Sequence, residues 1–365
     1  MVVDPLFLAV PGVRGLRPYE PGKPIEELER EYGIRNAVKL ASNENPLGPG
    51  PKALAAIGDW LPELGRYPDG SGFALKGALA HKFAVAPEQL TLGNGSNEVL
   101  ELIARAFVLP ENEVVFSEHA FAVYALVTQA VGATARVIPA RDWGHDLEAM
   151  TRAINPHTRV VFIANPNNPT GTWVPRQELE QLLQTTPTDV LVVVDEAYFE
   201  YVNERNYPNT IPWVDRFPNL VVTRTFSKVH GLAGLRVGFG VSRPEIADLL
   251  NRVREPFNVN SLALTAAQAA LGDDAHVSQS VAMNRAGMAQ LSQAFTDMGL
   301  AYIPSVGNFI SVDVGRPGAE IYGQLLRAGV IVRPIANYGM PNHLRVTVGL
   351  TEENQRFLEA LRKIL

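Results

Sequence analysis

Runs of consecutive apolar residues, separated by longer stretches with helical spacing, dominate the chain from about residue 90 to 240. Five of these runs are rich in β-branched residues, which favours strands. They occupy residues 113–117, 134–138, 159–164, 190–195 and 220–224. Because the apolar character is continuous and does not alternate, we expect strands buried on both faces. The pattern predicts an α/β fold in which helices cover both faces of a mostly parallel sheet.

The N-terminal part lacks this pattern. Residues 1 to about 50 are rich in proline and glycine, and residues 14–24 and 42–51 are typical of an extended arm with turns. Such an arm must pack on something, either its own large domain or a neighbouring subunit.

The C-terminal part has a mixed pattern. A helical stretch covers roughly residues 273–298, two short strands follow at 308–313 and 344–348, and an amphipathic helix starts at Thr351. The chain also exceeds the usual size of a single core. We therefore expect a large αβα domain and a small α+β domain. The expected parts are an arm of residues 1–50, a large domain of residues 51–255 and a small domain of residues 256–365.

Composition narrows the functional classes. The 365-residue chain is 46% hydrophobic and 19% charged, as in a well-packed enzyme. A formal charge of -6 argues against nucleic acid or an anionic membrane as the main partner. The absence of cysteine excludes disulfides, thiolate nucleophiles and Cys-ligated zinc, and we predict no metal site. The N-terminus lacks a basic region, and no apolar run reaches the ~20 residues that span a bilayer, so we expect a cytoplasmic protein.

Polar motifs follow several of the predicted strands, at the edge of a parallel sheet where ligands gather. Residues 91–98 place glycines before a helix that we expect over residues 99–107. Free N–H groups and the helix dipole favour an anion there, so a phosphate near Ser96 and Asn97 is one interpretation. A simple helix cap is the other. Residues 164–171 form a second, proline-stiffened turn that carries the amides of Asn165, Asn167 and Asn168.

Asp195 ends another apolar run, and Tyr198 lies three residues further on. A carboxylate in that position carries a large desolvation cost unless it meets a cation. A helix cap or a Mg²⁺-binding strand end, as in an NTPase, would also explain the aspartate. The chain has no G-x-x-x-x-G-K-[ST] loop, which argues against an NTPase.

Lys228 follows the last of these runs, with Thr225, Ser227 and Arg236 nearby. Burial lowers the pKa of a lysine, and an unprotonated amine can form a Schiff base. A surface lysine beside a loop is the alternative. Hydroxyls and a guanidinium around one lysine suggest a phosphate beside it. A lysine, a buried acid, an amide and a phosphate cradle together suit pyridoxal phosphate.

On these residues the chain resembles fold-type I, class II pyridoxal-phosphate-dependent aminotransferases, and more narrowly the histidinol-phosphate aminotransferase family. The resemblance covers essentially the whole chain, and the order and spacing of the segments make it specific. The segments are Arg-Pro-Tyr at 17–19, Leu-Ala-Ser-Asn-Glu-Asn-Pro-Leu-Gly at 40–48, Arg-Tyr-Pro-Asp at 66–69, Asn-Pro-Asn-Asn-Pro-Thr-Gly at 165–171, Asp-Glu-Ala-Tyr at 195–198, Thr-Phe-Ser-Lys at 225–228, Leu-Arg-Val-Gly at 235–238 and Leu-Arg-Val-Thr-Val-Gly at 344–349.

The resemblance implies roles around the cofactor. Lys228 would form the Schiff base and carry the proton, Asp195 would pair with the pyridinium nitrogen, and Asn168 and Tyr198 would hydrogen-bond the 3′-oxygen. Phe121 would stack on the ring, although Glu-His-Ala-Phe at 118–121 departs from the Pro-Thr-Tyr of many relatives. The implied phosphate ligands are Ser96, Asn97, Ser227 and Arg236, with Tyr67 reaching the phosphate from the other subunit of a homodimer.

The resemblance also implies a substrate site. Arg345 would clamp the anionic end of the substrate, Arg333 would add a second positive charge, and Tyr19 on the arm would cover the imidazole. For Arg333 and Tyr19, a surface arginine and a packing tyrosine are the alternatives. His119 is interpreted as a second-layer or surface residue, and His230 receives no role.

The expected reaction is the transamination of histidinol phosphate with 2-oxoglutarate, giving imidazole-acetol phosphate and glutamate in histidine biosynthesis. An aromatic amino-acid aminotransferase or a phosphothreonine decarboxylase would share every cofactor residue and differ only around Tyr19, Arg333 and Arg345. A non-catalytic, cofactor-binding regulator is a more distant alternative. Such regulators carry an N-terminal helix-turn-helix module, whereas only about 50 proline-rich residues precede the core here.

Overall fold

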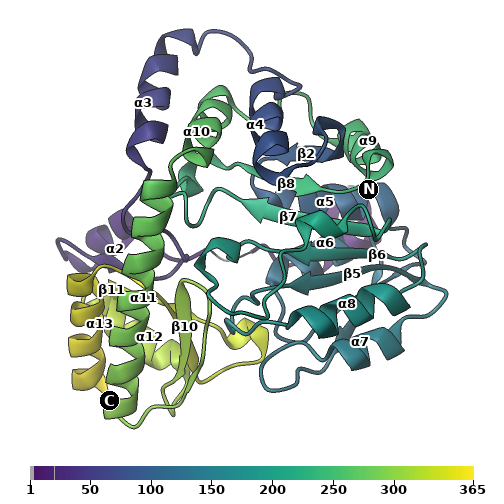
Figure 1. The fold of residues 1–365 in the computed structure, drawn as a ribbon. Helices are drawn as coiled ribbons and strands as arrows, with labels where there is room; N and C mark the ends of the chain where they lie inside the picture. The colour runs from purple at the N-terminus through teal and green to yellow at the C-terminus, as the bar shows by residue number, and fades with distance from the viewer. Residues whose placement is uncertain (1–3, 20) are drawn as a thin grey trace.

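The computed structural model describes residues 4–19 and 21–365, whose strands form three sheets (Figure 1). The largest has seven strands in the order β2-β8-β7-β6-β5-β3-β4. Neighbours are parallel from β7 to β4, whereas β8 is antiparallel to both β2 and β7. The strands are β2 (Leu90–Gly93), β3 (Glu113–Ser117), β4 (Thr134–Ile138), β5 (Thr158–Ala164), β6 (Leu191–Asp195), β7 (Leu220–Thr225) and β8 (Gly238–Val241). The predicted α/β fold with a mostly parallel central sheet is confirmed.

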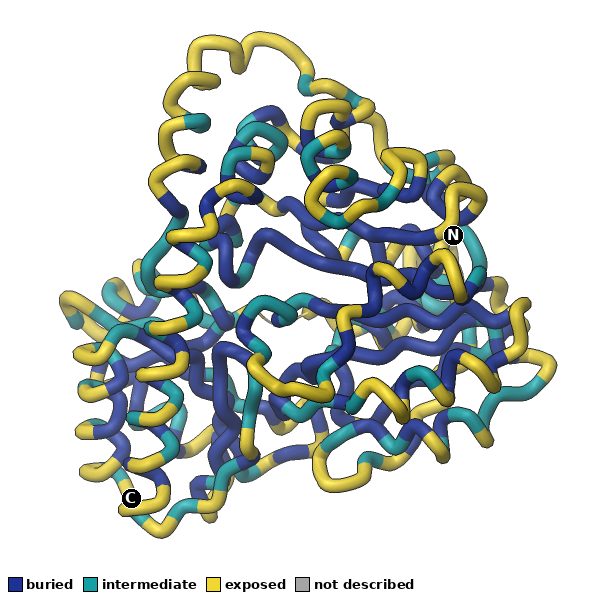
Figure 2. The backbone as a smooth tube through the Cα atoms, viewed as in Figure 1, coloured by how far each residue is buried: buried dark blue, intermediate teal, exposed yellow. Residues whose placement is uncertain are grey.

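Two hydrophobic cores lie on the two faces of this sheet. In β6, Val192 and Val194 belong to one core and Val193 to the other, as expected for a strand with period-two side chains buried on both sides. The first core includes residues of α3 (Pro51–Trp60), α4 (Phe73–Phe83), α7 (Leu147–Ala153), α8 (Arg176–Thr185) and α10 (Ser261–Leu271). The second includes residues of α5 (Ser96–Phe107), α6 (Ala122–Ala130) and α9 (Pro244–Val253). Figure 2 shows the central strands buried and the outer sides of the helices exposed.

The edge strand β4 departs from the expected burial. Four of its five residues are exposed, including Val137, and only Ile138 is buried. The expectation that every strand is buried on both faces is therefore wrong for β4. The physical reason is its position at the end of the sheet, where β3 is its only strand neighbour among the described residues.

A second, antiparallel sheet lies beside three helices, at the lower left of Figure 1. Its order is β12-β13-β10-β9, and its inner residues share a third core with the helices. The strands are β9 (Tyr302–Ile303), β10 (Phe309–Asp313), β12 (Arg333–Pro334) and β13 (His343–Thr347), and the helices are α11 (Asp274–Asp297), α12 (Gly318–Arg327) and α13 (Thr351–Ile364). The predicted long helix and the final helix from Thr351 are confirmed.

The N-terminal arm is more ordered than its composition suggests. It contains the helix α2 (Ile25–Tyr32), which the sequence pattern does not predict and which buries Leu28. The short strand β1 (Val38–Lys39) pairs in parallel with β11 (Val330–Ile331), so the arm is hydrogen-bonded to the C-terminal part. The remaining helices are α1 (Pro11–Arg14) and the 3₁₀ turns η1 (Pro5–Phe7), η2 (Leu61–Glu63), η3 (Pro87–Gln89), η4 (Phe199–Tyr201), η5 (Ile211–Trp213), η6 (Ala233–Leu235) and η7 (Ala336–Tyr338).

Boundaries differ from expectation at one helix. The helix expected at residues 99–107 begins earlier, at Ser96, directly after the glycine turn. The division into parts at residues 50 and 255 stays a prediction. The helix after the second boundary, α10, packs on α3 and α4.

Within residues 4–19 and 21–365, no helix combines the length and the apolar character required to cross a membrane.

Candidate active site

A cavity of about 420 Å³ opens where β5, β6 and β7 end and where β12 and β13 approach them. The arm contributes to its wall through Ser42, Asn43 and Glu44. Of the predicted site residues, those that line the cavity are Tyr19, Ser96, Asn97, Phe121, Asn168, Asp195, Tyr198, Ser227, Lys228, Arg236, Arg333 and Arg345. Segments far apart in the chain therefore converge on one site, as the carboxyl ends of parallel strands predict.

Lys228 projects into this cavity from the turn after β7. Its Nζ donates a hydrogen bond to the carbonyl oxygen of Ser42 at 3.2 Å and lies 5.6 Å from the centre of the Tyr198 ring. Burial, assisted by the Arg345 guanidinium and opposed by Glu44, lowers the pKa of Lys228 to about 7. A substantial fraction of the amine is therefore unprotonated near neutral pH, as a nucleophilic lysine requires.

Asp195 lies at the end of β6 with a hydrogen-bond donor on each carboxylate oxygen. Thr223 Oγ1 donates to Oδ1 at 3.0 Å, and Tyr124 OH donates to Oδ2 at 3.1 Å. Burial raises the pKa of Asp195 to about 6, while these two hydrogen bonds act in the opposite direction. The Asp195 carboxyl is consequently mostly ionised at neutral pH, even though the residue is buried.

Tyr198 and Asn168 present hydrogen-bonding groups to the same space. Tyr198 OH accepts from Asn43 Nδ2 at 2.9 Å, and burial raises the pKa of the phenol, so it remains a neutral donor. Asn168 Oδ1 accepts from Arg345 Nη1 at 2.6 Å, which leaves its amide hydrogens as the group that can donate. The peptide bonds before Pro166 and Pro169, in the turn that carries Asn168, are cis.

An anion cradle forms where the N-terminus of α5 meets the lysine turn. Arg236 Nη1 donates to Ser227 Oγ at 3.2 Å, and Thr225 Oγ1 lies 3.0 Å from the same oxygen. Gly95, with φ of +77°, precedes the buried Ser96, and a Cβ at Gly95 would lie 2.3 Å from Arg236 Nη2. Because Gly95 has no side chain, the Arg236 guanidinium can lie beside the N-terminus of α5. Donors from the arginine and from the helix backbone then face the same space, which suits a phosphate.

Two arginines from neighbouring strands bound the other side of the cavity. Arg345 is buried and donates from Nη2 to the carbonyl oxygen of Ala41 at 2.6 Å. Its Nε has no hydrogen-bond partner within the described ranges. The Arg333 guanidinium lies 5.7 Å from the centre of the Tyr19 ring, and Tyr19 is 46% exposed on the cavity wall.

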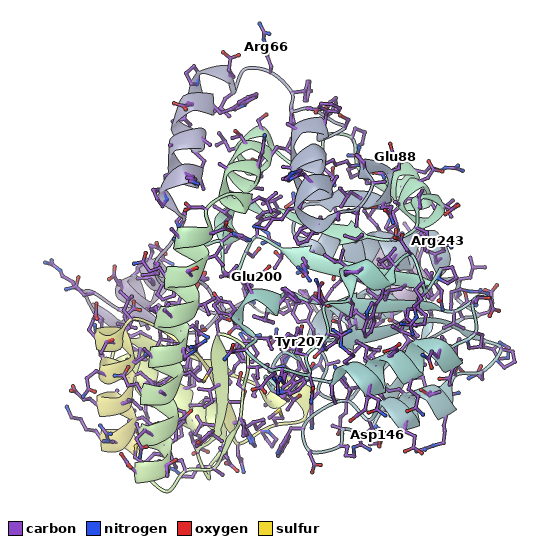
Figure 3. All side chains as sticks on the ribbon, in the orientation of Figure 1. Arg66, Glu88, Asp146, Glu200, Tyr207 and Arg243 are labelled. Carbon is purple, nitrogen blue, oxygen red and sulfur yellow. The ribbon has the colours of Figure 1, made fainter. Side chains whose placement is uncertain are left out.

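Tyr67 lies away from the cavity of its own chain. It is 83% exposed and its ring stacks on Phe257 with a centroid distance of 4.9 Å. Figure 3 shows its neighbour Arg66 at the outer end of the segment between α3 and α4. The prediction that Tyr67 acts on the other subunit of a dimer stays a prediction.

His119 and His230, the two histidines considered from the sequence, do not line the cavity. His119 is buried beneath the wall, where Nδ1 lies 2.7 Å from the carbonyl oxygen of Tyr338 and therefore carries the proton. His230 is also buried, and its ring packs on Phe226. Neither is positioned as a general base on a bound substrate.

Three residues that hydrogen-bond to predicted site residues were not themselves predicted from the sequence. Asn43, which binds Tyr198, lies in the segment 40–48 that carries the resemblance, so a signal was present. Tyr124 and Thr223 lie inside a helix and a strand and show no motif. Their contact with Asp195 becomes visible only in three dimensions.

A Schiff-base-competent lysine, a buried carboxylate and an anion cradle around one cavity are the parts that a pyridoxal-phosphate-dependent enzyme requires. Comparison with known proteins agrees. Residues 35–361 match the family described as aminotransferase class I and II. The chain belongs to this family.

Similar proteins cover nearly the whole chain. It is 61% identical over 98% of its length to histidinol-phosphate aminotransferase 1 of Nitrosococcus oceani, covering 97% of that protein. It is 63% identical over 99% of its length to histidinol-phosphate aminotransferase 2 of Pseudomonas fluorescens, covering 98%. The crystal structure of histidinol-phosphate aminotransferase from Sinorhizobium meliloti in complex with pyridoxal-5′-phosphate superposes with a TM-score of 0.89 at 29% identity, covering 97% of this chain and 96% of that one. The fold is thus that of a fold-type I aminotransferase.

Proposed function

We propose that the protein transfers the amino group of histidinol phosphate to 2-oxoglutarate, giving imidazole-acetol phosphate and glutamate in histidine biosynthesis. The observation that carries this proposal is the pair Arg333 and Arg345 at the cavity, beside the lysine. Two guanidiniums suit substrates with a phosphate or two carboxylates. The names of the relatives that match nearly the full chain favour the same reaction.

The residues present fit pyridoxal phosphate as the cofactor. The cradle of Ser96, Ser227 and Arg236, with Asn97 beside it, would hold the phosphate. Asp195 would bind the ring nitrogen, and Phe121 would cover the ring. Asn168 and Tyr198 would donate to the 3′-oxygen, since each has a donor directed by a neighbour that occupies its acceptor.

When bound, pyridoxal phosphate supplies an electron sink for the bond that breaks at the substrate Cα. The chain's own task is to move protons and hold charges. Lys228 Nζ would carry the proton between the substrate Cα and C4′ of the cofactor, because its lowered pKa lets the amine both accept and release it near neutral pH. Asp195 would hold the proton on the ring nitrogen.

The substrate would be held from the side opposite the cofactor phosphate. Arg345 would bind the carboxylate of glutamate in one half-reaction and the phosphate of histidinol phosphate in the other. Arg333 would add a second positive charge for that phosphate or for the glutamate side chain. Tyr19 would cover the imidazole, and its contact with Arg333 ties these two tasks together.

A homodimer in the cytoplasm is part of the proposal. Tyr67 would reach the cofactor phosphate of the partner subunit, which accounts for an aromatic side chain that is 83% exposed. Both substrates are ionic metabolites that lipid bilayers retain in the compartment where they are made, which supports the cytoplasm as the place of reaction.

Steady-state kinetics with a small panel of amino donors tests the substrate. Histidinol phosphate should give the highest kcat/KM with 2-oxoglutarate as acceptor. A strong preference for phenylalanine would leave the mechanism standing and replace the substrate by an aromatic amino acid. Release of CO₂ from phosphothreonine would identify a decarboxylase instead. Absence of turnover together with salt-sensitive DNA binding would indicate a regulator.

A further inference from the structure

Tyr124 connects two of the proposed cofactor contacts without lining the cavity. It lies on α6 and is fully buried, and its hydroxyl donates to Asp195 Oδ2 at 3.1 Å. Its ring is parallel to Phe162, with 4.6 Å between centroids and an interplanar angle of 4°. It also meets Phe121 edge-on, at 5.9 Å and 90°. The same side chain thus touches the residue proposed to cover the ring and the residue proposed to bind its nitrogen.

We propose that Tyr124 is the positioning residue for Asp195. The Tyr124 hydroxyl would hold the Asp195 carboxylate as an oriented anion that faces the protonated ring nitrogen of the cofactor. This inference rests on the proposed binding of pyridoxal phosphate and adds a residue to it. Tyr124 acts through Asp195 and does not itself contact the reacting atoms.

The geometry favours this role over simple packing. A buried tyrosine hydroxyl needs a partner, and the hydrogen bond found for Tyr124 goes to the carboxylate. Thr223 holds the other oxygen, so the two donors together fix the plane of the carboxylate. The rings of Phe121 and Phe162 pack against the Tyr124 ring and hold its hydroxyl in place. A phenylalanine would pack equally well between those rings but would leave Oδ2 with one donor fewer.

The hydrogen bond from Tyr124 helps to keep the Asp195 carboxyl ionised. Burial raises the pKa of the carboxyl to about 6, and the neighbouring Glu196 acts in the same direction. The hydrogen bonds from Thr223 and Tyr124 oppose that shift because they stabilise the ionised form. Removing one of them favours a protonated carboxyl, which cannot pair with a ring N–H.

The test compares two ligands that differ only at the ring nitrogen. The dissociation constants of pyridoxal phosphate and of 1-deazapyridoxal phosphate, in which a carbon replaces that nitrogen, are measured for the wild type and for Tyr124→Phe. The wild type should prefer pyridoxal phosphate, and Tyr124→Phe should lower that preference by about ten-fold or more. Tyr302→Phe, in the core beside the second sheet, is the control and should keep the wild-type preference.

The two ligands separate positioning from packing. If Tyr124→Phe weakens both ligands equally, or changes neither, the positioning role is overturned. A second readout uses ¹⁵N-labelled cofactor in the folded variant, where the ring-nitrogen resonance should move toward the unprotonated form. An unchanged resonance would also overturn the role. If the wild type fails to bind pyridoxal phosphate, the proposed function fails first, so the two failures are distinguishable.

Discussion

Arg333 on β12 is directly opposite Arg345 on the antiparallel strand β13. Side chains at opposed positions share a face of the sheet, so two cations are held side by side at the cavity. Opposed like charges destabilise a sheet unless an anion or other groups compensate. Arg345 has partners in Asn168 and Ala41, yet its Nε has none in the part of the chain that the structure describes. A bound anion would complete this arrangement.

Replacing the two arginines should have different effects on substrates. Arg333→Gln should raise KM about ten-fold for histidinol phosphate and glutamate, with a smaller effect on kcat, because one charged hydrogen bond is lost. Phenylalanine, which has a single carboxylate, should be affected little. Arg345→Gln should impair all three donors. Arg327→Gln, an exposed arginine at the end of α12, is the control. Equal loss with every donor for Arg333→Gln would contradict a role in binding the second charge.

Cofactor capture by the apoprotein should depend on pH through Lys228. The attacking amine must be unprotonated, and the pKa of Lys228 is lowered to about 7. Above that pH the amine is mostly neutral, and each unit below it reduces the neutral fraction about ten-fold. Stopped-flow absorbance after mixing with pyridoxal phosphate, from about pH 5.5 to about pH 8.5, measures the rate constant.

Three variants isolate the lysine in this experiment. Asp195 also titrates, with a pKa of about 6, so Asp195→Asn removes its contribution. Because the Asp195 charge raises the pKa of Lys228, the remaining midpoint should shift downward from the wild-type value of about 7. Lys228→Ala should capture no cofactor covalently and show no turnover, whereas Lys363→Ala, on the last helix, should behave as the wild type. A rate constant that still rises about ten-fold per pH unit at about pH 8.5, as expected for an ordinary lysine with a pKa of about 10.4, would contradict burial of the amine.

Mixed dimers should reveal whether Tyr67 acts on the partner subunit. Lys228→Ala homodimers should be inactive, and Tyr67→Phe homodimers should bind the cofactor phosphate weakly. After unfolding and refolding an equal mixture, each heterodimer contains one site with both residues intact if Tyr67 acts in trans. Random pairing then restores about a quarter of the wild-type sites. If Tyr67 acts within its own chain, the heterodimer site that keeps Lys228 still lacks Tyr67. Its activity should then equal that of a site in the Tyr67→Phe homodimer. Light scattering checks the dimer itself.

Breaking the buried ion pair of Arg224 and Glu196 should destabilise the protein strongly. Arg224 donates to Glu196 Oε2 through Nε at 2.9 Å and Nη2 at 2.7 Å, and its guanidinium lies 3.5 Å from the Phe199 ring centre. Arg224→Met leaves Glu196 buried without its cation, a loss of roughly 3–5 kcal/mol in the free energy of unfolding. Urea unfolding of the apoprotein measures it.

The matched control is an ion pair of the same type on the surface. Arg252 contacts Asp248 at 2.5 Å, one helical turn away, and both side chains are mostly exposed. Arg252→Met should change the free energy of unfolding by less than about 1 kcal/mol. Similar losses for the two variants would mean that burial does not control the strength of the inner pair.

The sequence predicts the polar residues that follow long apolar runs. Asp195 ends such a run and Lys228 follows one closely, so burial, and with it an altered pKa, could be inferred from their neighbours alone. The strand β8 is harder to recognise, because Gly-Phe-Gly-Val at 238–241 combines two glycines with a short length. Its antiparallel direction depends on pairing with β2 and β7, which no local pattern encodes.

Residues that act through another residue are the least predictable. Tyr124 occupies a buried position of the helix α6 and packs as a core aromatic, so its sequence context indicates only burial. Its partner Asp195 lies 71 positions further along the chain. Thr223 is likewise one of six buried residues in β7. Tertiary packing alone gives these two side chains their relation to the carboxylate.

The long-range contacts of the arm have a consequence for biosynthesis on the ribosome. The backbone N–H of Asn43 donates to Thr347 Oγ1 across 304 positions, and the carbonyl oxygen of Ala41 accepts from Arg345 across the same separation. Nascent chains fold from the N-terminus as they emerge. The arm must therefore wait until β13 has left the ribosomal tunnel before the wall around Lys228 can close. The reactive amine of Lys228 therefore gains its buried environment only after β13 has been synthesised, whatever part of the chain has folded before.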